Sequence, residues 1–169
     1  REVRMMLNPD DKDIEQLRNL GFTAAQVVPH GNFMPGQAAI ILLGGKSADE
    51  MVLANKSALY SDLIGTRGIY PSTVLGAMAK WRELYRQSMQ AKAYDQLYLA
   101  NPTGLVRPSS DQVLEAFYPV IDQRLPVLFK SEKLMDIQHA LSLKTDLGFA
   151  LVMADVKQGW PVMAKVKAS

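Results

Sequence analysis

Residues 125–160 constrain the fold more strongly than any other part of this sequence. The stretch LPVLFKSEKLMDIQHALSLKTDLGFALVMADVKQGW contains two short apolar runs, each followed by a segment whose apolar residues recur at helical spacing. Matching positions in the two runs, Leu128 and Val152, are about 24 residues apart, which leaves room for a helical crossover between parallel strands. Repetition of such a unit is typical of an α/β barrel or of an open doubly wound sheet.

The remaining elements are predicted from periodicity, glycine and proline. They are, in chain order, a helix from Asn8 to Gly21, strands at 22–28 and 38–45, strands near 51–54 and 58–64, a long helix at 71–99, a helix from Ser109 to Ile121 kinked at Pro119, a strand at 125–129, a helix from about Ser131 to Gly148, a strand at 149–153 and a last helix after Asp155. Together they predict one domain over residues 1–169, or a fragment of a larger barrel.

Composition excludes several classes of protein. A formal net charge of +2, with Lys and Arg scattered along the chain, gives no basic footprint for nucleic acid. The chain has no cysteine, which excludes disulfides and thiolate metal sites. No apolar run approaches the roughly 18–20 residues that span a membrane. Because the sequence begins REVRMML, without an initiator Met or a signal-peptide core, we interpret it as a piece of a longer polypeptide.

Polar side chains follow both apolar runs. Lys130 and Glu132 come after the first run, and Asp155 comes after the second. Barrel enzymes keep their working groups just beyond the carboxyl ends of the strands, where a lysine or a carboxylate can act as a base or a ligand. Glu132 and Asp155 equally suit the positive N-terminal end of a following helix. Lys130 and Asp155 are the catalytic candidates, and the structural interpretation of each stays open.

Other motifs are incomplete. GGKS (44–47) has Ile40 where a phosphate-binding loop requires a glycine. The two histidines, His30 and His139, form neither H-x-H nor H-E-x-x-H, so no metal ligand set is assigned. His30 falls in a loop after a predicted strand and is the stronger candidate of the two. His139 is predicted to be a solvated helix residue.

Two stretches carry a resemblance to a known family. LRNLGFTAAQVVPHGNFMPGQAAIILLGG (17–45) has a helix leading to Gly-Phe-Thr, a strand ending in Pro29, and then Gly31 and the pair Gly36-Gln37 before an apolar run. LPVLFKSEKLMDIQHALSLKTDLGFALVMADVKQGWPVMAKV (125–166) has a Pro-Val strand, a helix of the D-I-x-x-A-L kind, a second apolar strand and a last helix. Both resemble segments of the imidazolonepropionase-like amidohydrolases, and together they cover most of the chain.

The resemblance implies a (β/α)₈ barrel that hydrolyses C–N bonds of cyclic amides or peptides at one or two divalent metal ions. The family's ligands are a His-x-His on the first strand, histidines ending two middle strands and a late aspartate. This chain lacks the His-x-His, and it has Lys130 and then Asp155 where the next histidines are expected. An ammonium group binds no metal until it loses its proton, although a carboxylated lysine is a bridging ligand in the wider superfamily. We therefore expect a degenerate site, with no cofactor in this segment and zinc or iron in the parent protein.

Three hypotheses follow from these observations. The first is a non-catalytic α/β segment, a partial TIM-type barrel with mostly parallel strands, whose open edge is covered by the rest of a parent polypeptide or by another copy. We then expect the isolated segment to form a homo-oligomer. The second is a metal-dependent hydrolase completed by residues outside this chain, in which Lys130 and Asp155 face the metal. The third is a small-molecule binding module. The resemblance leaves the compartment of such a soluble protein open between the bacterial cytoplasm and the periplasm or cell envelope.

Overall fold

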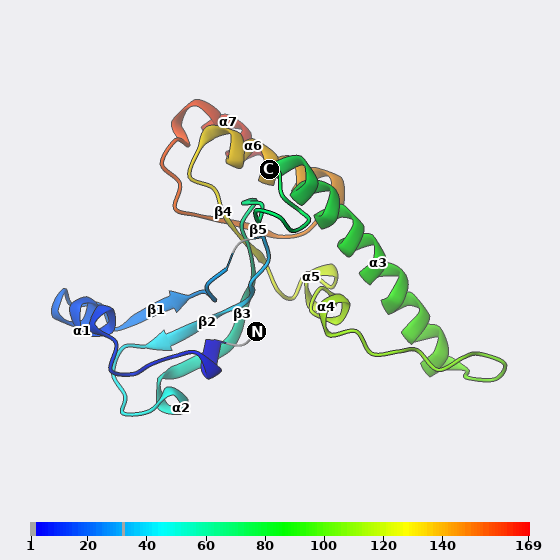
Figure 1. Cartoon of the computed structure of the whole chain (residues 1–169), viewed down its shortest axis with the longest axis horizontal. Coiled ribbons are helices and arrows are strands. Elements are labelled where there is room, and N and C mark those ends of the chain that lie inside the picture. Colours follow the sequence, from blue (N-terminus) through cyan, green and yellow to red (C-terminus); the bar gives the residue numbers. More distant parts are fainter. Residues whose placement is uncertain (1–2, 32) are drawn as a thin grey trace.

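A computed structural model describes residues 3–31 and 33–169 of the chain. Its centre is a five-stranded sheet that curls into a half-barrel, in which the spatial order of the strands follows their order in the sequence (Figure 1). The strands are β1 (Ala24–Val27), β2 (Gly36–Leu42), β3 (Val52–Ser61), β4 (Val127–Lys130) and β5 (Leu151–Ala154).

The sheet is mixed, so the prediction of mostly parallel strands was wrong. β1 pairs with β2 and β2 pairs with β3 in antiparallel fashion, whereas the pairs β3–β4 and β4–β5 are parallel. The reason is the length of the connections: short loops allow only antiparallel neighbours, and parallel pairing requires a long crossover. The strands predicted near 51–54 and 58–64 are a single strand, β3, whose pairing with β2 is interrupted by register shifts.

Apart from α2, for which no helix was predicted, the α-helices lie in the predicted regions with altered ends. They are α1 (Lys12–Asn19), α2 (Ala48–Met51), α3 (Val74–Ala100), α4 (Gln112–Glu115), α5 (Tyr118–Ile121), α6 (Leu134–Leu147) and α7 (Met163–Ala168), with 3-10 turns η1 (Val3–Met5) and η2 (Trp160–Val162). The helix predicted from Asn8 begins instead after Asp11, whose side chain accepts a hydrogen bond from the Asp13 backbone N–H. Pro119 divides the helix predicted over 109–121 into α4 and α5, because proline suits the first turn of a helix and disrupts its interior. None of the described helices is long and apolar enough to cross a membrane.

The main core lies where α3 and α6 cover β3 and β4. Trp81 of α3 is fully buried at its centre, with Phe117, Phe129 and Phe149 around the indole at centroid distances of 5.2, 5.6 and 5.0 Å. The indole N–H of Trp81 donates to Ser61 Oγ at 2.9 Å, and this hydroxyl donates in turn to the carbonyl of Phe33. The covering helix thus fixes the end of β3, and with it the position of the residues that follow.

A second core lies under the other end of the sheet. Ile14 of α1 packs with Ile41 and Leu43 against the face of the β1–β2 hairpin, and Met51 closes the cluster. Figure 1 shows α1 and the hairpin at the end of the molecule opposite the projecting tip of α3. The hairpin cavity and the charged strand-end groups described below have no residue in common.

Candidate strand-end site

The parallel strands β3, β4 and β5 bring their carboxyl ends to one rim of the sheet. Ser61, Phe129 and Met153 are level with one another, and Lys130 is level with Ala154. The register of β3 therefore places Asp62, the residue after Ser61, beside Lys130 on the same face, because side chains alternate along a strand. The rim of a parallel sheet is where residues distant in sequence converge on a common site.

Ion pairs link the charged side chains of this rim. Lys130 Nζ lies 2.9 Å from Glu132 Oε1, and Lys157 Nζ lies 3.0 Å from Glu132 Oε2. Lys157 Nζ also lies 3.7 Å from Asp155 Oδ1. Each oxygen of Glu132 therefore faces a different ammonium group, and we call Lys130, Glu132, Asp155 and Lys157 the rim network.

Backbone hydrogen bonds join the loops that carry the rim network. The N–H groups of Lys157 and Gln158 both donate to the carbonyl of Glu132, at 3.1 Å each. The backbone N–H of Leu134 donates to Gln158 Oε1 at 3.2 Å. Asp155, at the bend between β5 and this loop, has φ = 57°, a left-handed conformation that is uncommon for a residue other than glycine. The loops after β4 and β5 thus form one connected layer over the strand ends.

Electrostatics fixes the charge of this network at neutral pH. Hydrogen bonds from Lys130 and Lys157 lower the pKa of Glu132 from its ordinary value of 4.5 to about 2. The hydrogen bond to Glu132 raises the pKa of Lys130 in turn. Lys130 is therefore an ammonium ion in this arrangement, and a lysine must lose its proton before it can act as a base or bind a metal.

Asp62 and Tyr60 differ from the rim network because they are buried. The side chain of Asp62 accepts a hydrogen bond from the Ile64 backbone N–H at 3.1 Å, and burial raises its pKa. Burial likewise raises the pKa of Tyr60, which lies on the same face two residues earlier. Loss of water disfavours the charged form of an acid, so Asp62 and Tyr60 border the rim network in a less solvated environment.

The other sequence candidates lie elsewhere. His30 is exposed and lines a cavity at the hairpin. His139 is only half exposed, and its Nδ1 is buried without a hydrogen-bond partner in the described chain, which differs from the solvated position predicted for it. In GGKS (44–47), Ser47 caps α2 by accepting from the Glu50 N–H, so the motif starts a helix.

Sequence reasoning identified Lys130, Glu132 and Asp155 and missed Asp62, Tyr60 and Lys157. A signal for Asp62 was present, because it follows an apolar stretch in the same way as Lys130 and Asp155. The position of Lys157 depends on the backbone bonds between two loops, for which the sequence has no local pattern. Among residues 3–31 and 33–169, no group of three or more His, Cys, Asp and Glu side chains is placed to hold a metal ion.

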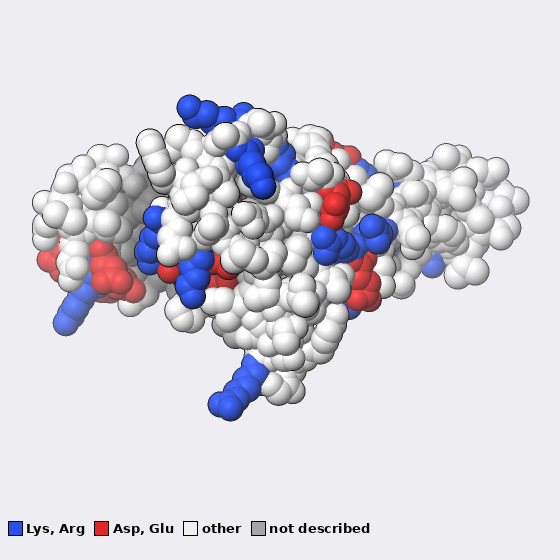
Figure 2. Space-filling model, turned by 90° about the horizontal axis from the view of Figure 1, so that it is seen from above, with Lys and Arg blue, Asp and Glu red and all other residues white. Residues whose placement is uncertain are grey.

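Charges elsewhere on the surface are interspersed. Figure 2 shows Lys and Arg among Asp and Glu over the middle of the molecule, whereas the projecting end that carries the tip of α3 is almost free of charge on the face shown. Residues 96–106 contain no charged side chain. Ionic contacts are thus concentrated around the sheet and its covering helices.

No model of a known protein family matches this sequence, and no curated protein matches it. Among solved structures, the fold is similar to that of an amidohydrolase from Thermotoga maritima MSB8, with a TM-score of 0.73 and 23% sequence identity. The match covers 87% of this chain and 40% of that chain, so this chain spans less than half the length of its structural neighbour. The described chain therefore has the fold of part of an amidohydrolase-like barrel.

Proposed function

We propose that this chain is a non-catalytic scaffold segment of an amidohydrolase-like protein, and that its rim network fastens two barrel loops together. The observation that carries this proposal is the position of Glu132 between two ammonium groups, 2.9 Å from Lys130 and 3.0 Å from Lys157. In this arrangement the side chains that would reach a metal ion neutralise one another. Assignment to the imidazolonepropionase-like branch, which rests on residues 17–45 and 125–166, is part of the same proposal.

The divalent metal that the fold implies does not fit the donors present here. Lys130 is protonated, and both oxygens of Glu132 are directed at cations. Metal ligands must be deprotonated and free to face the ion. Asp155, held 3.7 Å from Lys157, is the remaining oxygen donor of the rim network. This donor set supports no hydrolytic step.

A second candidate function is supported by the backbone of Asp155. Its φ of 57° is a strained conformation, and such conformations cluster at active sites. In this alternative, Asp155 is one ligand of a metal-dependent hydrolase of C–N bonds whose other ligands lie outside this chain. Lys130 would then face the metal as well.

Metal content distinguishes the two candidates. The purified chain is equilibrated with zinc, freed of excess ion and analysed by mass spectrometry of the metal, together with Asp155→Ala. Asp49→Ala is the matched control, because Asp49 is paired with Arg4 away from the rim. The scaffold proposal predicts far less than one zinc per chain in all three proteins. One zinc per chain that is lost in Asp155→Ala and retained in Asp49→Ala would overturn it and establish a metal site.

A further inference from the structure

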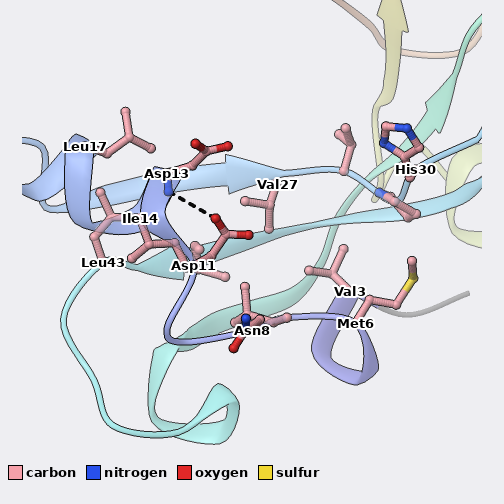
Figure 3. A pocket seen from close by; sticks show the side chains of 15 residues that line it. Val3, Met6, Asn8, Asp11, Asp13, Ile14, Leu17, Val27, His30 and Leu43 are labelled. Carbon is pink, nitrogen blue, oxygen red and sulfur yellow. Dashed lines mark hydrogen bonds between the residues drawn. The ribbon is translucent and has the colours of Figure 1, made fainter.

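A cavity of about 430 Å³ lies between α1, η1 and the β1–β2 hairpin (Figure 3). Its walls are mainly apolar and come from separate elements, with Ile14 from α1, Val27 from β1, Ile41 from β2 and Val3 from η1. Small-molecule sites are typically apolar hollows of about 300–1,000 Å³ with a few polar groups that orient the ligand. This cavity has the size and lining of such a site.

The cavity arises from how the second core is built. The hairpin contributes Ala25 to this face, where its small side chain packs against the second core and also lines the cavity. Ile41 and Leu43 are fully buried at the base, so the floor is rigidly packed. A larger side chain at position 25 would therefore project into the cavity.

Among the described residues, the ionisable side chains of the lining are the carboxylates of Asp11 and Asp13 and the imidazole of His30. Asp11 and Asp13 line the cavity at the start of α1, and no Lys or Arg of the described chain lines it. One oxygen of Asp11 accepts a hydrogen bond from the Asp13 backbone N–H at 3.0 Å, and in Figure 3 its other oxygen is directed towards Val27. Neither carboxylate belongs to an ion pair within residues 3–31 and 33–169.

The balance of charge at this end favours a cation. The N-terminus of a helix carries roughly half a positive charge, which by itself favours an anion. Residues 10–19 carry four acidic and two basic side chains, and this net charge of −2 exceeds it. Figure 2 shows acidic side chains, with a basic side chain projecting from among them, at the end of the molecule where α1 lies. A negatively charged entrance next to apolar walls complements a ligand that has a cationic group at one end and a hydrocarbon portion at the other.

We propose that this cavity binds a small organic ammonium ion, with the ammonium group at Asp11 and Asp13 and the hydrocarbon body against the partly exposed side chains of Leu7, Leu17 and Val27. This site is separate from the strand ends and does not rest on the scaffold function proposed above. A zinc result at the rim therefore leaves it unaffected.

The test is a titration of the purified chain with benzylamine, followed by two-dimensional ¹H–¹⁵N NMR. Benzyl alcohol has the same shape without the charge, and phenylacetate reverses the charge. We expect saturable chemical-shift changes at residues of α1 and β1. Benzylamine should bind about fivefold more tightly than benzyl alcohol, a modest preference because each solvent-exposed ion pair contributes little. Phenylacetate is expected to bind more weakly than both.

Variants distinguish the contribution of the two carboxylates to binding from that of the cavity volume. Asp11→Asn together with Asp13→Asn should abolish the preference for benzylamine over benzyl alcohol, and asparagine at position 11 still caps the helix. Ala25→Leu should fill the space and remove binding of both compounds, whereas Ala24→Leu, on the exposed face of the same strand, should leave it intact. Far-UV circular dichroism and urea unfolding establish that each variant is folded. Absence of saturable binding, equal affinity for amine and alcohol, or an unchanged preference in the asparagine variant would overturn the proposal.

Discussion

The hydrogen bond between Trp81 and Ser61 is the buried polar contact of the core whose contribution to stability a single substitution can test. Both side chains are fully buried, and the indole N–H has Ser61 Oγ as its acceptor at 2.9 Å. The carbonyl of Phe33 that accepts from Ser61 also accepts from the Asp62 backbone N–H, so it keeps a partner when the hydroxyl is removed. Removal of the Ser61 hydroxyl therefore leaves mainly the Trp81 N–H without a hydrogen-bond partner.

Ser61→Ala should lower the free energy of unfolding by about 1–3 kcal/mol, the usual cost of a buried donor without an acceptor. Ser88→Ala is the matched control, since Ser88 is equally buried but donates only to the Leu84 carbonyl of its own helix. Alanine favours the helix, so we expect this control to change stability by less than about 0.5 kcal/mol. Urea unfolding followed by tryptophan fluorescence measures both. Equal effects would show that the indole N–H finds another acceptor.

Glu132 gives the rim network a dependence on pH. Its pKa is lowered from 4.5 to about 2 by Lys130 and Lys157, so its ion pairs stabilise the folded chain above pH 4.5 and are lost as the pH falls from 4.5 to 2. Glu132→Gln should lower stability at pH 7, and its difference from the wild type should vanish near pH 2. Glu83→Gln, which removes the exposed pair with Lys80, should change stability little at pH 7. Urea unfolding at several pH values checks this, and a constant difference would contradict the role of Glu132.

The residues of the rim were predictable from the sequence only in part. Lys130, Glu132 and Asp155 follow apolar runs, and this position alone identifies them as strand-end groups. Their arrangement is set by tertiary structure, because Lys157 reaches Glu132 through backbone bonds between two loops. The sequence suggested substitutes for metal ligands, whereas the geometry shows mutual ion pairing.

At the scale of elements, the β4–α6–β5 unit has the most explicit sequence signals. Gly148 ends α6 in a left-handed conformation with φ = 79°, as its position at the end of the helical pattern suggests.

Gly148→Ala should lower the free energy of unfolding by about 1 kcal/mol, because an alanine at positive φ is strained. Gly44→Ala is the control, since Gly44 has open space around it and no positive φ, and it should be nearly neutral. Urea unfolding compares the two, and equal losses would contradict the role assigned to the conformation.

The direction of β1, β2 and β3 could not be read from their apolar patterns. An apolar run such as 38–45 fits a buried strand of either orientation, and the barrel resemblance favoured parallel pairing. Connection length was the better guide, because the loop between β1 and β2 is too short for a crossover. Periodicity located these strands, and only the tertiary structure gave their pairing.

At the scale of the whole molecule, the half-barrel leaves β5 as an edge strand with no described strand beyond it. The carbonyls of Ala150 and Ala154 accept hydrogen bonds from the β4 side, so the backbone groups of Leu151 and Met153 lie on the opposite edge. Parallel strands are seldom left at an open edge, because unpaired N–H and C=O groups invite another strand. The likeness to part of a longer amidohydrolase chain gives the same expectation of a covering partner.

We therefore expect the isolated chain to associate with itself through β5, which analytical ultracentrifugation over a range of concentrations can measure. Val152 is 45% exposed on this strand, and Val152→Lys places a charge where two edges would meet. The variant should shift the equilibrium towards monomer, because edge lysines oppose strand pairing.

Leu99→Lys is the control, because it makes a similar change of charge away from the sheet, at a residue 82% exposed near the tip of α3. It should leave association unchanged. A monomer at all concentrations, or equal effects of the two lysines, would show that the edge is not the surface through which copies meet.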